Sequence, residues 1–315
     1  MDISVVIPLY NEEESLPELF AWIQRVMDGN HFSYEVIFVN DGSTDRSWEV
    51  IENLRTQSDK VKGIKFRRNY GKSPGLNCGF QRAKGDVVIT MDADLQDDIN
   101  VIDRFVEKYM EGCDVVYGVR NKRETDTFFK RTTAEGFYKF MKILGVDVVF
   151  NHADYRLMSR RALEGLSEYK EVNLFLRGIV PLIGFKSDYV YYDRAERFAG
   201  ESKYPLKKMI SFALDGITSF SVKPLKLISN LGILISVLSI FGLLYALISH
   251  LCGVTVAGWT AIVASIWLLG GLQMLCLGVV GGYIGKIYSE VKQRPRFLIE
   301  THLKAEPEEK VLDEH

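Results

Sequence analysis

Two aspartates one residue apart follow a short apolar run in the first third of the chain. Asp92 and Asp94 come directly after Val87–Thr90, and Gln96 continues the same alternation. At a strand end, alternate side chains point to one side, so two carboxylates can converge on one hard cation. A polar cluster, Asn40–Asp45, follows a second apolar run. The spacing predicts a divalent metal site completed by the phosphates of a nucleotide ligand. The alternative is that the two aspartates lie in a solvated turn and bind no metal.

Alternating apolar runs and helix-like segments must position these residues. Short β-branched or aromatic runs predict strands at 3–7, 35–39, 61–66, 87–91 and 114–118. Helices are expected from near Asn11, with Glu12, Glu13 and Glu14 in the first turn, after Asp45, and at 77–83. This alternation predicts an α/β fold, a Rossmann-like and mostly parallel sheet covered by helices, with ligands at the carboxyl ends of the strands.

The pattern loosens after the fifth predicted strand. A charged stretch, 120–131, precedes a helical segment at 134–144 that could serve as a lid or an acceptor-side element. A helix at 173–183 and a strand at 187–192 follow. The basic amphipathic segment 202–221 then suits a membrane interface.

Two uninterrupted apolar spans predict a transmembrane hairpin. Leu227–Leu251 and Ala257–Ile284 contain no Asp, Glu, Lys or Arg, and each exceeds the roughly 20 residues that cross a bilayer. Lysines and arginines flank the pair on both sides, whereas the short loop between the spans is uncharged. The positive-inside rule therefore puts the N-terminal domain and both termini in the cytosol of a multi-pass protein of the inner (plasma) membrane. Two buried core helices of a soluble domain are the alternative.

These segments define four expected regions: a cytosolic catalytic domain at 1–200, an amphipathic interfacial segment at 201–224, two transmembrane helices at 225–288, and a cytosolic tail at 289–315. Glycines in the second span, at 270–271, 278 and 281–282, allow close helix packing, either within the hairpin or between protomers of a homo-oligomer. The sequence leaves both arrangements open.

Composition excludes some classes of protein. The formal net charge of −2 gives no basic field for nucleic acid. Four cysteines share no short metal-ligand spacing, which indicates reduced thiols. The chain begins with a strand-like run, so we expect no cleaved signal.

Six ordered motifs together resemble family 2 glycosyltransferases of the dolichol-phosphate mannose synthase and bactoprenol glucosyltransferase type. They are Val5–Glu12, Val39–Asp45, Arg68–Lys72, Asp92–Asp97, Asp154–Ser159 and Ser202–Tyr204. With the apolar hairpin, the resemblance covers the chain to about residue 300. One departure is Asn151-His152-Ala153, where many relatives carry a small pair such as Thr-Gly.

The resemblance implies a GT-A fold and a set of donor-site residues. Residues that would bind the nucleotide-sugar are Pro8, Tyr10, Glu12, Asp41, Lys72 and Asp92, with Asp41 on the base. Asp92, Asp94 and Gln96 would hold Mg²⁺ or Mn²⁺ against the diphosphate, and Asp94 would be catalytic through this role. Pro8 and Asp41 also have structural interpretations, as a strand terminator and a turn former.

The resemblance also implies an acceptor side. Asp154 corresponds to the family's proposed catalytic aspartate, with a positioning or proton-accepting role, against a purely structural ion pair with Arg156. Cations suited to a phosphate are Arg131, Arg156, Arg197 and Lys203, with Ser202 and Lys203 on a loop closing over the diphosphate. Arg120 and Arg123 are further candidates, and His152 has no second histidine at a metal-like spacing.

The expected activity is inverting, metal-dependent transfer of a sugar from a nucleotide-sugar, UDP-glucose being favoured, to a polyisoprenyl phosphate, undecaprenyl phosphate being favoured. A transferase for another lipid or glycan acceptor is one alternative. A polymerising synthase is disfavoured because the chain has no Gln-x-x-Arg-Trp motif. The alternative from another class is a catalytically silent membrane subunit that binds sugar nucleotides.

Overall fold

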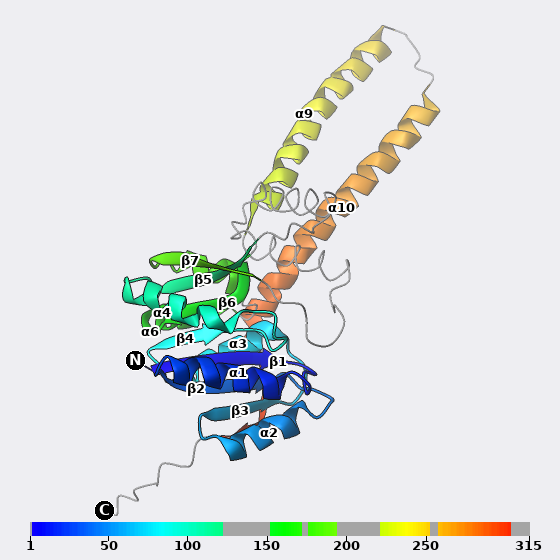
Figure 1. The fold of residues 1–315 in the computed structure, drawn as a ribbon. Coiled ribbons are helices and arrows are strands. Elements are labelled where there is room, and N and C mark those ends of the chain that lie inside the picture. The colour runs from blue at the N-terminus through cyan, green and yellow to red at the C-terminus, as the bar shows by residue number, and fades with distance from the viewer. Residues whose placement is uncertain (1, 122–151, 172–175, 194–220, 253–257, 304–315) are drawn as a thin grey trace, which may run out of the picture. The chain divides into compact units, whose positions relative to one another are not determined.

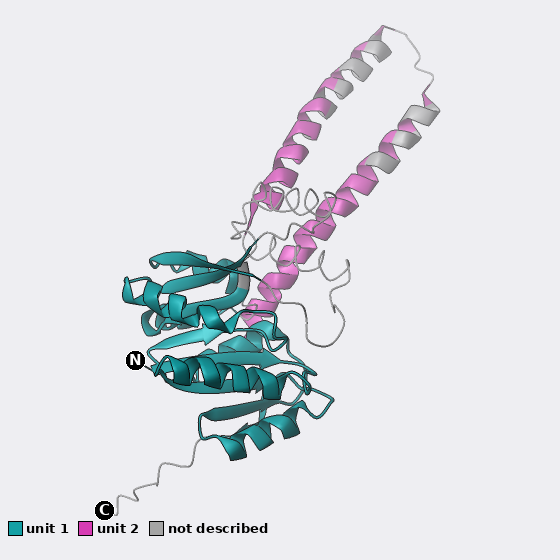
Figure 2. Cartoon of the chain, in the orientation of Figure 1, with its two compact units in different colours: residues 1–132, 148–205, 294–315 teal, residues 133–147, 206–293 magenta. Residues whose placement is uncertain are grey.

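The computed structural model describes residues 2–121, 152–171, 176–193, 221–252 and 258–303, with part of the side chains in the last two long helices. The described residues fall into two compact units (Figure 2), one within 1–132, 148–205 and 294–315 and the other within 133–147 and 206–293. The first unit contains the residues that could do chemistry.

An eight-stranded sheet forms the first unit, in the order β7-β5-β6-β4-β1-β2-β3-β8 (Figure 1). The strands are β1 (Asp2–Leu9), β2 (Ser33–Asn40), β3 (Val61–Phe66), β4 (Val87–Thr90), β5 (Val115–Arg120), β6 (His152–Ser159), β7 (Ser187–Tyr192) and β8 (Ile299–Leu303). Strands β4, β1, β2 and β3 are parallel neighbours. The α/β class is confirmed, but the sheet is mixed, because β6 and β8 run antiparallel to their neighbours.

Helices between the strands bury apolar faces against this sheet. They are α1 (Leu16–Gly29), α2 (Ser47–Gln57), α3 (Lys72–Phe80), the 3-10 turn η1 (Ile99–Val101), α4 (Ile102–Met110), α6 (Arg160–Ser167) and α7 (Leu176–Leu182). Helix α1 buries Leu16, Leu19, Phe20, Ile23 and Met27 in the core beside β1 residues such as Val5.

Two predicted helix starts were wrong, and two strands were not predicted. The first helix begins at Leu16 and not near Asn11, because Asn11 has φ +56° and Pro17 sits in the first turn. Helix α3 begins at Lys72, five residues before the predicted start. Strands β6 and β8 are additions to the predicted elements, since the sequence pattern indicates a tail at 289–315 and a polar motif at Asp154–Ser159.

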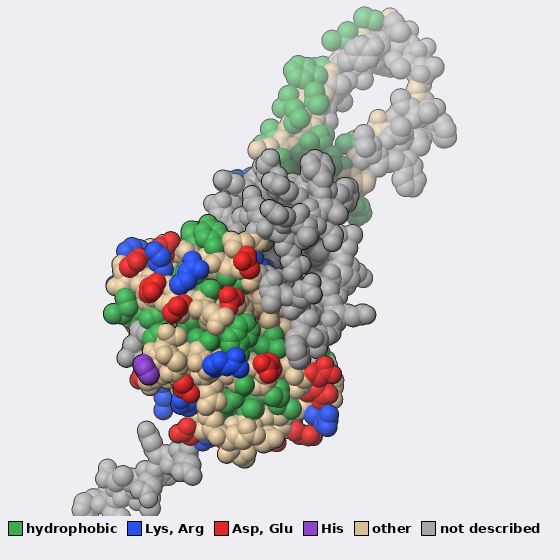
Figure 3. Space-filling model, viewed as in Figure 1, with side chains coloured by type: hydrophobic (Ala, Val, Ile, Leu, Met, Phe, Trp, Pro, Cys, Tyr) green, Lys and Arg blue, Asp and Glu red, His purple; other side chains and the backbone are tan. Residues whose placement is uncertain are grey.

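The second unit contains α9 (Lys223–Leu251) and α10 (Trp259–Lys292). Large apolar side chains on both are exposed, including Leu234, Phe241 and Ile284, and hydrophobic side chains cover described parts of α9 in Figure 3. Among the described residues, Leu269–Lys292 has the length and mean hydropathy, 1.2, of a membrane span, with none of it buried. The expected hairpin with its two crossings stays a prediction.

Candidate active site

The polar residues of the site gather where β1, β2 and β4 end. Because these strands are parallel neighbours, their carboxyl ends lie at one edge of the sheet. The antiparallel strand β6 brings in Asp154: Thr90, the last residue of β4, pairs with Arg156, so Asp154 lies beside the turn that follows β4. The hydroxyl of Thr90 also donates to the backbone carbonyl of Asp154.

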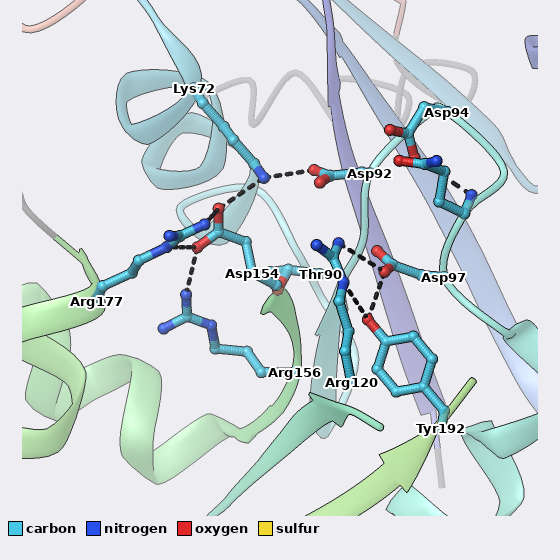
Figure 4. A network of polar contacts seen from close by, with 11 residues as sticks. Lys72, Thr90, Asp92, Asp94, Asp97, Arg120, Asp154, Arg156, Arg177 and Tyr192 are labelled. Atoms are coloured by element: carbon cyan, nitrogen blue, oxygen red, sulfur yellow. Dashed lines mark hydrogen bonds and ion pairs between the residues drawn. The ribbon is translucent and has the colours of Figure 1, made fainter. Parts of the chain in front are cut away.

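Asp154 is the centre of a cationic cluster (Figure 4). Its carboxylate accepts hydrogen bonds from Arg156 Nη2 at 2.9 Å and from Arg177 Nε and Nη2 at 3.0 and 3.1 Å. Lys72 Nζ lies 2.7 Å from Asp154 Oδ2 and also pairs with Asp92 Oδ1. Asp154 is buried, with 8% of its surface exposed. Lys72 therefore bridges the carboxylate of Asp154 on β6 and that of Asp92 in the turn that follows β4.

The charges of this cluster stabilise one another. Burial alone would raise the pKa of Asp154, but Lys72, Arg177 and Arg156 hold it well below its usual value. Burial disfavours the ammonium of Lys72, yet Asp154 and Asp92 outweigh this and raise the pKa of Lys72. Arg156 is buried, and its Nη1 has no hydrogen-bond partner in the part of the chain that the structure describes. With three cations on one carboxylate, the cluster favours an additional anion.

The Asp92–Gln96 segment is a turn after β4, and not an extension of the strand. Leu95 has φ +59°, and Gln96 N donates to Asp94 Oδ1 at 3.3 Å. In Figure 4 Asp92 points toward Lys72 while Asp94 lies farther along the turn. The argument from strand alternation therefore does not apply to these residues. Within the described ranges, no three His, Cys, Asp or Glu side chains are grouped to hold a metal ion.

The donor set nevertheless fits a hard cation chemically. Two carboxylates and the amide oxygen of Gln96 are the oxygen ligands that Mg²⁺ and Mn²⁺ accept, with the remaining positions left to water or phosphate. Asp92 already pairs with the ammonium of Lys72, so its carboxylate lies where it can bind a cation.

A second polar group lies at the ends of β1 and β2. Asp41 is buried and accepts backbone N–H groups of Tyr70 at 2.7 Å and Gly71 at 2.8 Å. Burial raises the pKa of Asp41 to about 6, against these two hydrogen bonds, which lower it. Gly42, at φ +70°, is required here because a Cβ would overlap the backbone of Arg68.

The loops after β1 and β2 are tied together side by side. Glu12 N donates to Ser47 Oγ at 2.9 Å, and Thr44 N donates to Asn11 Oδ1 at 2.8 Å. Pro8 is buried at the end of β1, and Tyr10 is 37% exposed just beyond it. The predicted donor residues Pro8, Tyr10, Glu12 and Asp41 therefore come from adjacent strand ends.

The structure brings Lys72, Asp92, Asp154 and Arg156 into contact, whereas Arg131, Arg197, Ser202 and Lys203 lie outside the described residues.

Sequence reasoning missed Arg177. A signal was available, because Arg177 is the only charged residue in the apolar stretch 173–183. It also missed the buried Asp97, which accepts hydrogen bonds from Tyr192 Oη at 2.5 Å and Arg120 Nη2 at 3.2 Å. Burial and the nearby Asp92 raise the pKa of Asp97.

Comparison with known proteins identifies the family. The family model for glycosyl transferase family 2 matches residues 4–167, just over half of the chain. The uncharacterized glycosyltransferase YkoT of Bacillus subtilis (strain 168) is 51% identical over 309 residues, which cover 96% of this chain and 92% of the relative. The SfII prophage-derived bactoprenol glucosyl transferase of Shigella flexneri is 40% identical over 309 residues, with 98% and 100% covered.

A homologous protein in Escherichia coli (strain K12), the prophage bactoprenol glucosyl transferase homolog, is 41% identical over 301 residues, covering 95% of this chain and 98% of the relative. Among solved structures, mannosyl-3-phosphoglycerate synthase from Rubrobacter xylanophilus matches with a TM-score of 0.48 and 14% identity, covering 68% of this chain and 71% of that one. The matches in sequence run over nearly the whole chain. The chain belongs to glycosyl transferase family 2 and is a glycosyltransferase.

Proposed function

We propose that this enzyme has a GT-A catalytic domain and transfers a sugar with inversion from a nucleotide-sugar to a polyisoprenyl phosphate at the cytosolic face of the membrane. The observation that supports this most is the cluster of Lys72, Arg156 and Arg177 around Asp154, beside Asp92. Such a site suits two phosphorylated ligands that meet. Relatives named bactoprenol glucosyl transferases favour UDP-glucose as donor and undecaprenyl phosphate as acceptor.

The donor would lie across the ends of β1, β2 and β4. Tyr10, Pro8 and Glu12 would line the nucleoside pocket, and the Asp41 carboxylate would accept an N–H of the base. Lys72 would give up part of its pairing with Asp92 and bind the diphosphate. Asp92, Asp94 and Gln96 would hold Mg²⁺ or Mn²⁺, which stabilises the negative charge that develops on the departing diphosphate.

In the transfer step, an oxygen of the acceptor phosphate forms a bond to the anomeric carbon. The bond from that carbon to the diphosphate oxygen breaks, and its electron pair leaves with the nucleoside diphosphate. A phosphate monoester, with a second pKa near 6, is already largely deprotonated at neutral pH, so the step needs no strong base. Asp154 would therefore hold Arg156, Arg177 and Lys72 in place for the phosphates rather than take up a proton.

The cations outside the described residues keep their expected roles in this proposal. Arg131 would bind the lipid phosphate together with Arg156 of the described site. Arg197 would bind a phosphate, and Ser202 and Lys203, at the start of the amphipathic segment 201–224, would close over the diphosphate.

The connectivity of the chain supports a hairpin in the membrane. Strand β8 pairs with β3 in the same sheet as β1, so residues on both sides of α9 and α10 belong to one unit. A chain that leaves this unit and returns to it on the same side of a bilayer crosses an even number of times. Helices α9 and α10, about 44 and 51 Å long at 1.5 Å per residue, both exceed the roughly 30 Å hydrocarbon core. We propose two crossings within 225–288, with the catalytic domain (1–200) and the tail (289–315) cytosolic.

The test is turnover by purified full-length enzyme with a panel of nucleotide-sugars and one short polyisoprenyl phosphate, with and without EDTA. We expect one donor to be used, and EDTA to stop transfer until Mg²⁺ or Mn²⁺ is added back. Turnover that persists in EDTA contradicts the metal assignment. Nucleotide binding without turnover of any donor would favour the silent subunit, and transfer only to another lipid or glycan would favour the other acceptor class.

A further inference from the structure

The segment that follows α10 pairs with β3 at the edge of the sheet, beside residues 67–71, which lead to Lys72. Strand β8 pairs antiparallel with β3, and the register shifts between Lys65 and Phe66, where β3 ends. Just beyond this shift, Arg67 N donates to the backbone carbonyl of Leu298 at 3.3 Å. The end of β3 is thus held from one side by residues that come after the apolar helix.

Aromatic contacts extend this connection into the loop after β3. The ring of Phe297 stacks on Phe66 with centroids 5.1 Å apart and an interplanar angle of 11°. Phe66, which is fully buried, meets Tyr70 edge-on at 5.7 Å and 90°. The guanidinium of Arg82, just after α3, lies 6.0 Å from the centre of the Phe297 ring. Phe297 therefore contacts both ends of the segment that begins at Phe66 and continues through α3.

That segment carries two parts of the donor site. The backbone N–H groups of Tyr70 and Gly71 are the donors that Asp41 accepts, and Gly71 adopts φ +97°. The next residue, Lys72, bridges Asp92 and Asp154. Because only Gly71 separates Tyr70 from Lys72, a shift of the Tyr70 ring moves the backbone N–H groups that donate to Asp41 together with the start of α3.

We propose that Phe297 is a positioning residue for the donor site: by packing on Phe66 it fixes Tyr70, and through Tyr70 and Gly71 it fixes the start of α3, which carries Lys72. The strand after the membrane segment is then part of the catalytic apparatus. The identity of the bound ligand rests on the function proposed above, but the positioning can be measured without any substrate.

Hydrogen exchange by mass spectrometry on the full-length protein in detergent tests the positioning directly. Phe297→Ala removes the stacked ring, and we expect the amides of residues 67–72 to exchange about 3- to 10-fold faster, as loss of an aromatic pair implies. Leu298→Ala is the matched control, because the Leu298 side chain is exposed and its backbone carbonyl is retained. Phe297→Tyr keeps the ring and should restore wild-type exchange.

Faster exchange confined to 299–303, or an equal effect of Leu298→Ala, would overturn the proposal. If Phe297→Ala exchanges faster throughout β1 and β4 as well, the whole fold is weakened, and Phe297→Leu is then measured because it loses less packing. Unchanged exchange at residues 67–72 in Phe297→Leu would also overturn the proposal.

Kinetics separate positioning from general weakening of the fold. Phe297→Ala should raise KM for the nucleotide-sugar about 3- to 10-fold and change kcat by less than about twofold, with Phe297→Tyr near wild type. An unchanged KM would contradict the proposed effect on the donor site. If the wild-type enzyme turns over none of the donors tested, the proposed substrates are wrong, while the exchange experiment still decides the role of Phe297.

Discussion

Arg177 donates two hydrogen bonds to the carboxylate of Asp154, from Nε to Oδ1 at 3.0 Å and from Nη2 to Oδ2 at 3.1 Å. A bidentate pair of this kind fixes both side chains. Together with Arg156 and Lys72, it keeps Asp154 ionised and leaves it poorly suited to accept a proton. The carboxylate therefore organises the cations of the site.

Asp154→Asn should destabilise the protein and stop transfer. Removing one partner from a buried ionic cluster costs about 3 to 5 kcal/mol, because the remaining charges stay buried without compensation. Asp154→Glu keeps the charge and should lose less stability. Thermal and denaturant unfolding of the three proteins measure this difference, and equal stability of Asp154→Asn and wild type would contradict the account.

The pH dependence of that difference has a defined sign. The folded pKa of Asp154 lies below its unfolded value of about 3.9, so its stabilising contribution is present above that value and is lost as pH falls through the folded pKa. We expect a constant gap in stability between wild type and Asp154→Asn from about pH 5 to pH 8. A gap that shrinks across this range would show that Asp154 titrates there.

Donor binding should weaken below about pH 6 through Asp41, whose buried carboxyl has its pKa raised to about 6. Protonation removes the acceptor that we assign to an N–H of the base, so affinity falls as pH goes from 7 to 5. The measurement is calorimetric binding of UDP-glucose at pH 5 and pH 7. UDP is unsuitable as the ligand because its terminal phosphate itself titrates near pH 6 and would add its own pH dependence. Asp41→Asn should bind weakly at both pH values, and a wild-type affinity that is flat across this range would contradict the assignment.

Gly79 allows α3 to pack against β1. A Cβ at this position would overlap Val6 Cγ1, so Gly79→Ala should lower the free energy of unfolding by about 1 to 3 kcal/mol. Gly29→Ala, at the end of α1, is the control: nothing lies within 4 Å of its Cβ position, and stability should stay the same or rise. Denaturant unfolding measures the stability of both variants, and a Gly79→Ala protein as stable as wild type would contradict this close packing.

The structure shows which parts of the fold a single sequence can predict. Apolar runs identified β1 to β5 because a strand buried on both faces needs consecutive apolar residues. They missed β6 because its polar motif residues face the site, and β8 because it pairs only at the sheet edge. Among the site residues, Asp92 and Asp154 could be named from motifs. Lys72 bridges these two aspartates, and Arg177 of α7 contacts Asp154. Both contacts depend on long-range packing that no local sequence pattern encodes.

Native Cys252, at the end of α9, reports on the proposed topology. If α9 and α10 cross as a hairpin, a membrane-impermeant maleimide added outside spheroplasts should label Cys252 in a Cys276→Ser background. A cysteine introduced at exposed Gln57 of α2, in a protein that also carries Cys252→Ser and Cys276→Ser, should be labelled only after permeabilisation. Labelling of Gln57→Cys in intact spheroplasts, or of Cys252 only after permeabilisation, would contradict the orientation.

The most direct measurement is the mass of the product formed from UDP-glucose and undecaprenyl phosphate by the purified enzyme, compared with Asp94→Ala and with Glu49→Ala. Glu49 lies on the surface of α2 and serves as the control for a lost carboxylate. We predict a lipid with one hexose joined to its phosphate for wild type and Glu49→Ala, and a loss of about 100-fold or more in rate for Asp94→Ala. Full activity in Asp94→Ala, or consumption of donor without a sugar-linked lipid, would contradict the account.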